Sequence, residues 1–404
     1  MAAYLAGMVL FFLGIAVTIA LHEWGHYITA RMFGMKVRRF FIGFGPKVFS
    51  VRRGETEYGV KAVPVGGFCE IAGMTAQDVL EPDEVNRAMY LKPWWQRIVV
   101  LSGGVIMNVL VGFVVLYGVA VSSGIPNPDA DFTATVASVQ CVPDRQLDAS
   151  TLSDCIGTGP AGEAGVMEGD RILGVDGRDV ATFQEVRDTV WALPGETVTL
   201  TIERGQELLR VPVTVDEVTR LTATGQEVTV GAIGVTSQPP TDVYKKFGPV
   251  EGVGATARFT GDMIEATFEG LMAFPAKIPG VVASIFGAER DIEGPMSVVG
   301  ASRIGGELVE RSMWDMFMMM LASLNFFLAL FNLVPLPPLD GGHIAVVLYE
   351  RFRDFFRKLR GKTPGGPADY TRLMPITVGV AALLLSIGAV VIIADVVNPI
   401  RLFG

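Results

Sequence analysis

The chain has 404 residues, of which 50% are hydrophobic and only 19% are charged, and its mean hydropathy is +0.43. A water-soluble globular protein of this length carries more charge, so the composition excludes that class. The net charge of −9 argues against a nucleic-acid partner, because the few basic segments lie beside apolar runs, where they fit membrane topology better.

Four apolar runs approach or exceed the roughly 20 residues that a helix needs to cross a bilayer. They lie near residues 4–21, 98–121, 315–335 and 374–394. No basic segment precedes the first run and no small-residue cleavage site follows it. We therefore expect this run to stay in the mature protein as a spanning helix.

The distribution of charge predicts how the spans are oriented. Basic residues gather at 31–53, after the first run, and at 351–362, before the fourth. Residues 122–242 instead carry 19 Asp and Glu against 7 Lys and Arg. The positive-inside rule puts both basic clusters in the cytoplasm. The acidic segment and both termini then lie on the opposite side of the membrane.

Two of the three histidines form the sequence H-E-W-G-H at the end of the first run. On a helix, His22 and His26 share one face, so their imidazoles can bind a single metal ion. Glu23 lies between them and can contact water at the metal without being a ligand itself. This pattern is typical of zinc-assisted hydrolysis, in which zinc lowers the pKa of water and a carboxylate transfers the proton.

Residues 37–72 mix short β-prone runs with glycines, which predicts one or two hairpins at the membrane edge. Cys69 falls on the reducing, cytoplasmic side. Cys141 and Cys155 fall outside, 14 positions apart, and we expect them to form a disulfide, with two free thiols as the alternative.

The segment from about 133 to 236 is predicted to be a compact domain, in which β-rich runs flank a helix at 183–191. Residues 242–310 show partial amphipathic periodicity. A helix on the outer membrane surface and an ordinary packing helix both fit this pattern.

The third histidine ends the sequence N-L-V-P-L-P-P-L-D-G-G-H at residues 332–343. By the predicted topology, this motif reaches the cytoplasmic end of the third span, at the same depth as H-E-W-G-H. A catalytic zinc ion takes three protein ligands, so one is still missing. Asp340 is the better third ligand, because the prolines and glycines around it break the helix. His343 is the alternative ligand, or else a polar residue at the start of a helix.

These motifs resemble those of the site-2 protease family of intramembrane metalloproteases. Residues 157–180 (GTGPAGEAGVMEGDRILGVDGRDV) are similar to the core of a bacterial PDZ domain. Four spans with one PDZ domain between the second and third resemble the RseP group, and within it the actinobacterial and mycobacterial Rip-type members. One difference is Ser102-Gly103-Gly104, where relatives usually carry Ala-Gly-Pro, so we expect a softer kink there.

The resemblance implies one zinc ion per chain, held by His22, His26 and Asp340, with Glu23 as the general base. It also implies that Asn332 holds the unwound substrate backbone; a hydrogen bond inside the helix is the alternative role. The loops that present the substrate strand are then expected to include these residues: Gly43, Gly45, Gly66, Gly67 and Phe68.

The predicted fold is a polytopic α-helical membrane protein with four transmembrane helices, a membrane-edge β-hairpin element and one extracytoplasmic PDZ domain of the α+β class. The predicted division of the chain is as follows: 1–30, first span; 31–96, cytoplasmic and membrane-edge β element; 97–122, second span; 123–240, PDZ domain with the cysteine-bearing insert; 241–312, connecting segment; 313–345, third span; 346–372, basic cytoplasmic segment; 373–396, fourth span; 397–404, outer tail.

We therefore predict a zinc-dependent endopeptidase of the bacterial plasma membrane. Its expected substrates are single-span regulators such as anti-sigma factors, and its other partners are membrane lipids. The PDZ domain either binds a C-terminal peptide in its groove or sterically excludes untrimmed substrates. The alternative function is a non-catalytic membrane scaffold that binds partners through the PDZ domain.

Overall fold

The computed structural model describes residues 1–127, 130–148, 151–222 and 226–402, without the side chains of residues 64 and 65. The chain forms two compact units. Residues 1–125 and 246–404 make up a helical unit, and residues 126–245 make up a β-rich unit.

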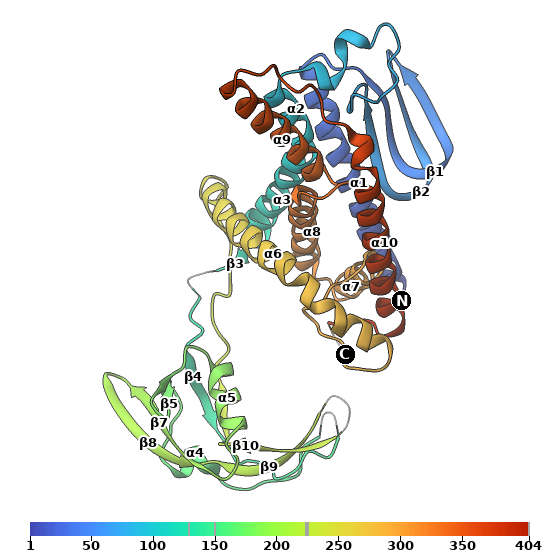
Figure 1. Cartoon of the computed structure of the whole chain (residues 1–404). Helices are drawn as coiled ribbons and strands as arrows, with labels where there is room; N and C mark the ends of the chain where they lie inside the picture. The colour runs from blue at the N-terminus through green and yellow to red at the C-terminus, as the bar shows by residue number, and fades with distance from the viewer. Residues whose placement is uncertain (128–129, 149–150, 223–225, 403–404) are drawn as a thin grey trace. The chain divides into compact units, whose positions relative to one another are not determined.

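The helical unit is built from helices that coincide with the apolar runs of the sequence, together with shorter helices that connect them (Figure 1). These helices are α1 (Ala2–Met32), α2 (Trp94–Leu101), α3 (Gly103–Ser122), α6 (Pro249–Ile285), α7 (Val298–Glu310), α8 (Trp314–Leu333), α9 (Asp340–Leu359) and α10 (Met374–Val397).

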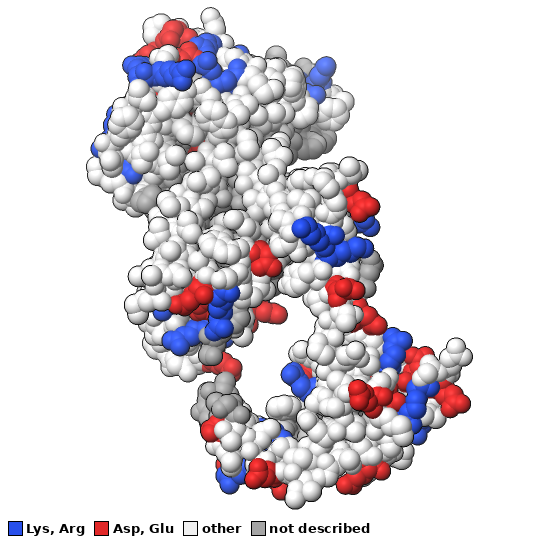
Figure 2. Space-filling view, turned by 180° about the vertical axis from the view of Figure 1, so that it is seen from behind, with Lys and Arg blue, Asp and Glu red and all other residues white. Residues whose placement is uncertain are grey.

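Five of the described helices are long and apolar enough to cross a membrane, one more than the sequence predicted. The four expected spans correspond to α1, α3, α8 and α10, and the additional helix is α6. α6 has the lowest mean hydropathy of the five, 1.2, because acidic residues interrupt its apolar pattern. Figure 2 shows a largely uncharged surface across the middle of the helical unit, as expected for a protein that lies in lipid.

The predicted apolar side of α6 does not form one buried face. Phe259, Met263 and Ile264 pack against the α3–α8 contact, whereas Phe268 and Met272 are exposed. The sequence allowed either a helix on the outer membrane surface or an ordinary packing helix. The first half of α6 is a packing helix.

Two predicted spans are interrupted. Ser102 separates α2 from α3, and α8 ends at Leu333. Residues 334–339 are not helical, because the prolines in this segment lack the N–H donors that a helix needs. The predicted third span, 313–345, therefore divides into α8 and the first turns of α9.

β1 (Val37–Arg53) and β2 (Thr56–Ile71) form the predicted hairpin. Both strands bend, so that Phe41 pairs with Phe68 on one side and with Gly59 on the other. The bends fall at Gly43 and Gly66, whose φ angles of 89° and 103° favour glycine. The hairpin therefore makes a small curved sheet that packs against α1 (Figure 1).

The β-rich unit contains a six-stranded sheet of order β11-β4-β5-β7-β8, with β6 paired to β5, and a separate β9–β10 hairpin. The predicted helix is α5 (Phe183–Trp191), and its apolar side covers a core that includes Val186, Leu200 and Ile202. The other elements are β3 (Ile125–Pro126), β4 (Ala134–Val139), α4 (Gly159–Glu163), β5 (Arg171–Val175), β6 (Arg178–Asp179), β7 (Thr197–Arg204), β8 (Glu207–Thr214), β9 (Asp216–Leu221), β10 (Glu227–Ala232), β11 (Val235–Ser237) and β12 (Tyr244–Lys245).

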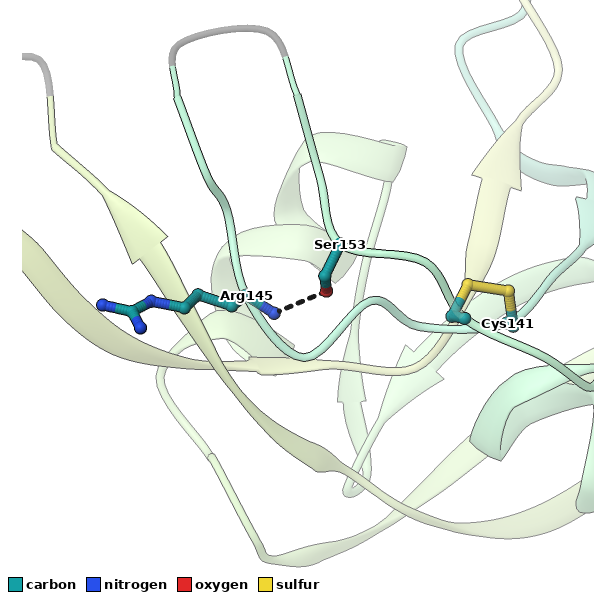
Figure 3. Close-up of a disulfide and its surroundings, with 4 residues drawn as sticks. Cys141, Arg145 and Ser153 are labelled. Atoms are coloured by element: carbon teal, nitrogen blue, oxygen red, sulfur yellow. Dashed lines mark hydrogen bonds between the residues drawn. A yellow bond between two sulfur atoms is a disulfide. The ribbon is translucent and has the colours of Figure 1, made fainter.

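The segment between β4 and α4 is closed by a disulfide between Cys141 and Cys155, the pair that the sequence predicts. Inside the loop, the backbone N–H of Arg145 donates to Ser153 Oγ over 3.2 Å (Figure 3). Cys69 is a free thiol in β2.

Candidate metal centre

Three side chains that could bind a metal converge where α1, α8 and α9 meet. His22 and His26 lie on α1, and Asp340 is the first residue of α9. Asp340 Oδ2 lies 3.3 Å from the Nε2 atom of each histidine. The two Nε2 atoms are 3.2 Å apart. All three residues are mostly buried, so the convergence joins two motifs that are more than 300 residues apart.

Local structure explains the convergence. His22 and His26 are four residues apart on one helix, so their rings lie on one face, with centroids 4.9 Å apart. The break after Leu333 turns the chain, and α9 then begins at Asp340. A short carboxylate at this position can reach the α1 histidines, which a residue inside a continuous helix could not do.

A backbone carbonyl orients one of the imidazoles. His26 Nδ1–H donates to the carbonyl oxygen of Val100, at 2.8 Å. The proton on Nδ1 leaves the Nε2 lone pair free for a metal, the arrangement common to metal-binding histidines. His22 Nδ1 has no hydrogen-bond partner among the described residues.

The donor atoms fit zinc. Ligands about 2.0–2.1 Å from a tetrahedral zinc ion lie about 3.3 Å from one another, and the three pairs here are separated by 3.2–3.3 Å. In the neutral His26 ring the proton is on Nδ1, so Nε2 turns a lone pair towards Asp340 Oδ2, and a cation between these two atoms would remove their repulsion. Two imidazoles and one carboxylate also leave one of four positions open, as in catalytic zinc sites.

Glu23 lies beside this group, between α1 and the β1–β2 hairpin. The Glu23 carboxylate interacts electrostatically with His22, His26 and Asp340. The backbone N–H of Cys69 points towards the same carboxylate. A Cβ atom added to Gly67 would lie 3.1 Å from Glu23 Cγ. The second half of β2 thus passes directly over the Glu23 side chain.

In this structure, α3 lies so close to the histidine-bearing part of α1 that a Cβ atom would clash at two successive positions of α3. A Cβ atom on Gly103 would lie 2.6 Å from the carbonyl oxygen of Gly25, and one on Gly104 would lie 2.5 Å from His26 Nε2. In the sequence, these two glycines stand out only as a difference from relatives. Their short distance from the imidazoles is visible only in the structure.

The residues predicted to bind substrate occupy two places. Phe68 is in the part of β2 next to Glu23, and its ring stacks on Phe41, with centroids 5.6 Å apart. Gly43 and Gly45 lie at the bend of β1. Asn332 is half-buried in the last turn of α8 and is not part of the donor group.

His343, the alternative ligand, also lies outside the donor group. Its Nδ1 is 3.3 Å from the Tyr370 hydroxyl, and the two rings stack with centroids 5.6 Å apart. In this structure His343 is a packing residue of the first turn of α9.

The profile of peptidase family M50 matches residues 10–364 of the chain. The chain belongs to peptidase family M50. The zinc metalloprotease Rip1 of Mycobacterium bovis is 43% identical to this M50 peptidase over 405 residues, covering 99% of both chains. Rip1 of Mycolicibacterium smegmatis is 44% identical over 406 residues, covering 98% of both, and Rip1 of Mycobacterium tuberculosis is 42% identical over 405 residues, covering 99% of both. This M50 peptidase is a multi-pass membrane protein and a zinc metalloprotease, as predicted.

A solved PDZ domain from an SdrC-like protein of Listeria monocytogenes covers 26% of this M50 peptidase and 87% of that chain, at 20% identity. The TM-score of this match is 0.18. The β-rich unit itself has a cavity of about 240 Å³ between α5 and residues 231–235. Val186 and Val190 of α5 line one wall, and the disulfide-closed loop contributes Cys141 and Leu152.

Proposed function

We propose that this M50 peptidase hydrolyses peptide bonds within the transmembrane segments of single-span membrane proteins, such as anti-sigma factors. One observation carries the proposal: two histidines and one aspartate converge at the end of a helix that is apolar enough to span a membrane. Ionisable side chains are costly at membrane depth, and they are retained there for function.

The metal would be held by His22, His26 and Asp340. When bound, zinc polarises the scissile carbonyl group and lowers the pKa of water towards neutrality. The Glu23 carboxylate is beside the donor atoms, so it accepts the proton of the attacking water and delivers it to the leaving amine. Val100 contributes by holding the His26 ring in one tautomer.

The substrate must be unwound before it can be cut, because the amides of a membrane helix are hydrogen-bonded within the helix. The part of β2 from Gly67 to Ile71 pairs with β1 on one side and passes over Glu23. An extended substrate segment that adds to this strand would run past the catalytic carboxylate. Strand addition supplies main-chain hydrogen bonds that replace those of the helix. Asn332, in the last turn of α8, is proposed to hold the other side of the segment.

The distribution of charge supports an orientation for this proposal. Basic side chains of the β1–β2 region and of α9 favour a metal centre on the cytoplasmic side of a bacterial plasma membrane. The β-rich unit then lies outside, where an oxidised Cys141–Cys155 pair is stable. As a PDZ domain, the unit would accept the C-terminus of a trimmed substrate in the cavity beside α5.

The test uses the purified full-length protein in detergent with a single-span anti-sigma factor as the substrate. Glu23→Gln should abolish cleavage while zinc content and thermal stability stay at the wild-type level, because the donor atoms are intact. The matched control is Glu269→Gln, which removes an exposed carboxylate of α6 and should cleave normally. Cleavage by Glu23→Gln at the wild-type rate would exclude Glu23 as the base.

A further inference from the structure

α9 has two contrasting sides. One side is buried: Val347 is 1% exposed and Glu350 is 7% exposed, and the Glu350 carboxylate accepts from Arg97 of α2 at 2.6 Å. The opposite side exposes a stripe of large apolar side chains at intervals of four, three and four residues. Leu348 is 37% exposed, Phe352 62%, Phe355 50% and Leu359 68%. We call these four residues the apolar stripe.

Cations flank the apolar stripe. Arg351 and Lys358 are exposed on α9, and the exposed Arg360 and Lys362 lie within three residues of its C-terminal end. The two acidic residues in the body of the helix do not offset them, because Glu350 is paired with Arg97 and Asp354 with Arg353. The exposed side of α9 is therefore both apolar and positively charged.

The same surface continues onto α2. Figure 1 shows α2 and α9 side by side at one end of the helical unit. Trp94 and Trp95, at the start of α2, are 43% and 47% exposed. The Arg351 guanidinium lies 5.8 Å from the centre of the Trp94 ring. Exposed tryptophans and arginines are typical of the membrane–water interface.

The position of α9 in the chain agrees with this surface. α9 follows α8 and precedes α10, and both of these helices are candidate spans. A helix that connects two spans is held close to the bilayer surface. An apolar side bordered by basic residues is the pattern of a helix that lies in the interface of an anionic membrane.

A second copy of the chain fits this surface less well. A two-fold contact through the apolar stripe would bring Arg351, Lys358 and Arg360 of one copy towards the same cations of the other. Like charges that face each other across an interface destabilise it. Anionic lipid phosphates instead complement these cations, and each such contact strengthens surface binding about fivefold.

We propose that α9 is an interfacial anchor that binds anionic phospholipid and thereby holds Asp340 against the α1 histidines. Asp340 is the first residue of the anchor. The position of Asp340 therefore follows the position of α9. Two contacts through Glu350 fix α9: Arg97 of α2 forms an ion pair with its carboxylate, and the backbone N–H of Ala368 donates to the same carboxylate. This coupling rests on the proposed role of Asp340 as a metal ligand.

The first experiment measures where α9 lies, without using catalysis. A spin label is attached at Phe355→Cys in a Cys69→Ala background, and the full-length protein is placed in vesicles of phosphatidylcholine with phosphatidylglycerol. Labels at Leu385→Cys on α10 and Asp179→Cys in β6, both exposed, serve as lipid and water references. The label at 355 should be shielded from a water-soluble relaxation agent and accessible to oxygen. Full exposure to water, or dipolar broadening from a second label, would overturn the anchor.

The second experiment measures the coupling. Cleavage and zinc retention are compared in vesicles of phosphatidylcholine alone and in the mixture with phosphatidylglycerol. We expect the anionic lipid to raise both, by roughly fivefold for cleavage, as for one charge–lipid contact. Arg351→Gln/Lys358→Gln/Arg360→Gln should remove this dependence.

The matched control is Arg178→Gln/Arg187→Gln/Arg210→Gln, which removes three charges from the β-rich unit and should keep the dependence on lipid. A shielded label at 355 with no effect of lipid on zinc retention or cleavage would overturn the coupling. Because the depth of the label does not depend on zinc or on cleavage, a failure of the anchor is distinguishable from a failure of the proposed catalytic site.

Discussion

Gly104→Ala is a small change that should disable the metal centre. Gly104 lies in the first turn of α3, against the two imidazoles. A Cβ atom at this position would lie 2.5 Å from His22 Cε1, 2.5 Å from His26 Nε2 and 2.6 Å from His22 Nε2. Gly104 is inside a helix, so alanine at this position would not strain the backbone. The added methyl group itself would occupy space at the donor atoms.

The size of the effect follows from the displacement required. Ordinary contacts of a Cβ atom begin near 3.4 Å, so the histidine rings or α3 must move by about 0.9 Å to accept the methyl group. Metal–ligand distances tolerate only about 0.2 Å, and a misplacement of about 1 Å at a catalytic site costs about 100-fold in rate. We therefore expect zinc affinity and kcat/KM each to fall by about 100-fold.

The assay is a zinc competition titration with a chelator, followed by cleavage of a single-span substrate. Gly118→Ala is the control on the same helix, because a Cβ atom there would meet no atom of the described residues within 4 Å. This control should bind zinc and cleave normally, and it should unfold at a slightly higher temperature, because alanine is favoured over glycine in a helix. If Gly104→Ala binds zinc as tightly as Gly118→Ala, the close approach of α3 to the histidines is wrong.

Three further predictions concern stability, each measured by thermal unfolding of the full-length protein. Glu350→Gln leaves Arg97 buried without its ion partner and should cost about 3–5 kcal/mol, whereas Arg97→Met/Glu350→Leu should recover most of this loss; equal loss in both variants would contradict the ion pair. Cys141→Ser opens the loop that ends at Cys155 and should lower the stability of the β-rich unit by about 3 kcal/mol under oxidising conditions, and no change there would mean that the disulfide does not form. The hydrogen bond from Arg38 holds the pKa of Glu84 at about 2, against an ordinary value of 4.5, so the stability it contributes is complete above pH 4.5 and is lost as the pH falls towards 2. Glu84→Gln should lack this part of the acid dependence, and an acid profile identical to that of the wild type would contradict it.

Much of the fold could be predicted because the sequence patterns are strong and local. The helix predicted at 183–191 matches α5 residue for residue. Other features of the fold depend on tertiary contacts that the sequence does not show. The first half of α6 is buried by α3 and α8, and the amphipathic pattern of its sequence does not reveal these partners.

The donor group could be predicted because its chemistry is visible in the sequence: two histidines four residues apart, and an aspartate among helix-breaking prolines. The residues that support the donor group could not be predicted from the sequence. Val100 contributes only a backbone carbonyl, and Gly104 contributes only the absence of a side chain. Neither leaves a chemical signal in the sequence, and both depend on how closely α2 and α3 approach α1.

The central claim is that side chains from two distant motifs hold one zinc ion together. The most direct measurement is the zinc content of the purified wild type, compared with His22→Ala and Asp340→Ala, together with X-ray absorption at the zinc edge. We predict one zinc ion per wild-type chain, bound by two imidazole nitrogens and a carboxylate oxygen, and almost none in either variant. An Asp340→Ala protein that keeps a full zinc ion with an unchanged absorption spectrum would contradict the claim.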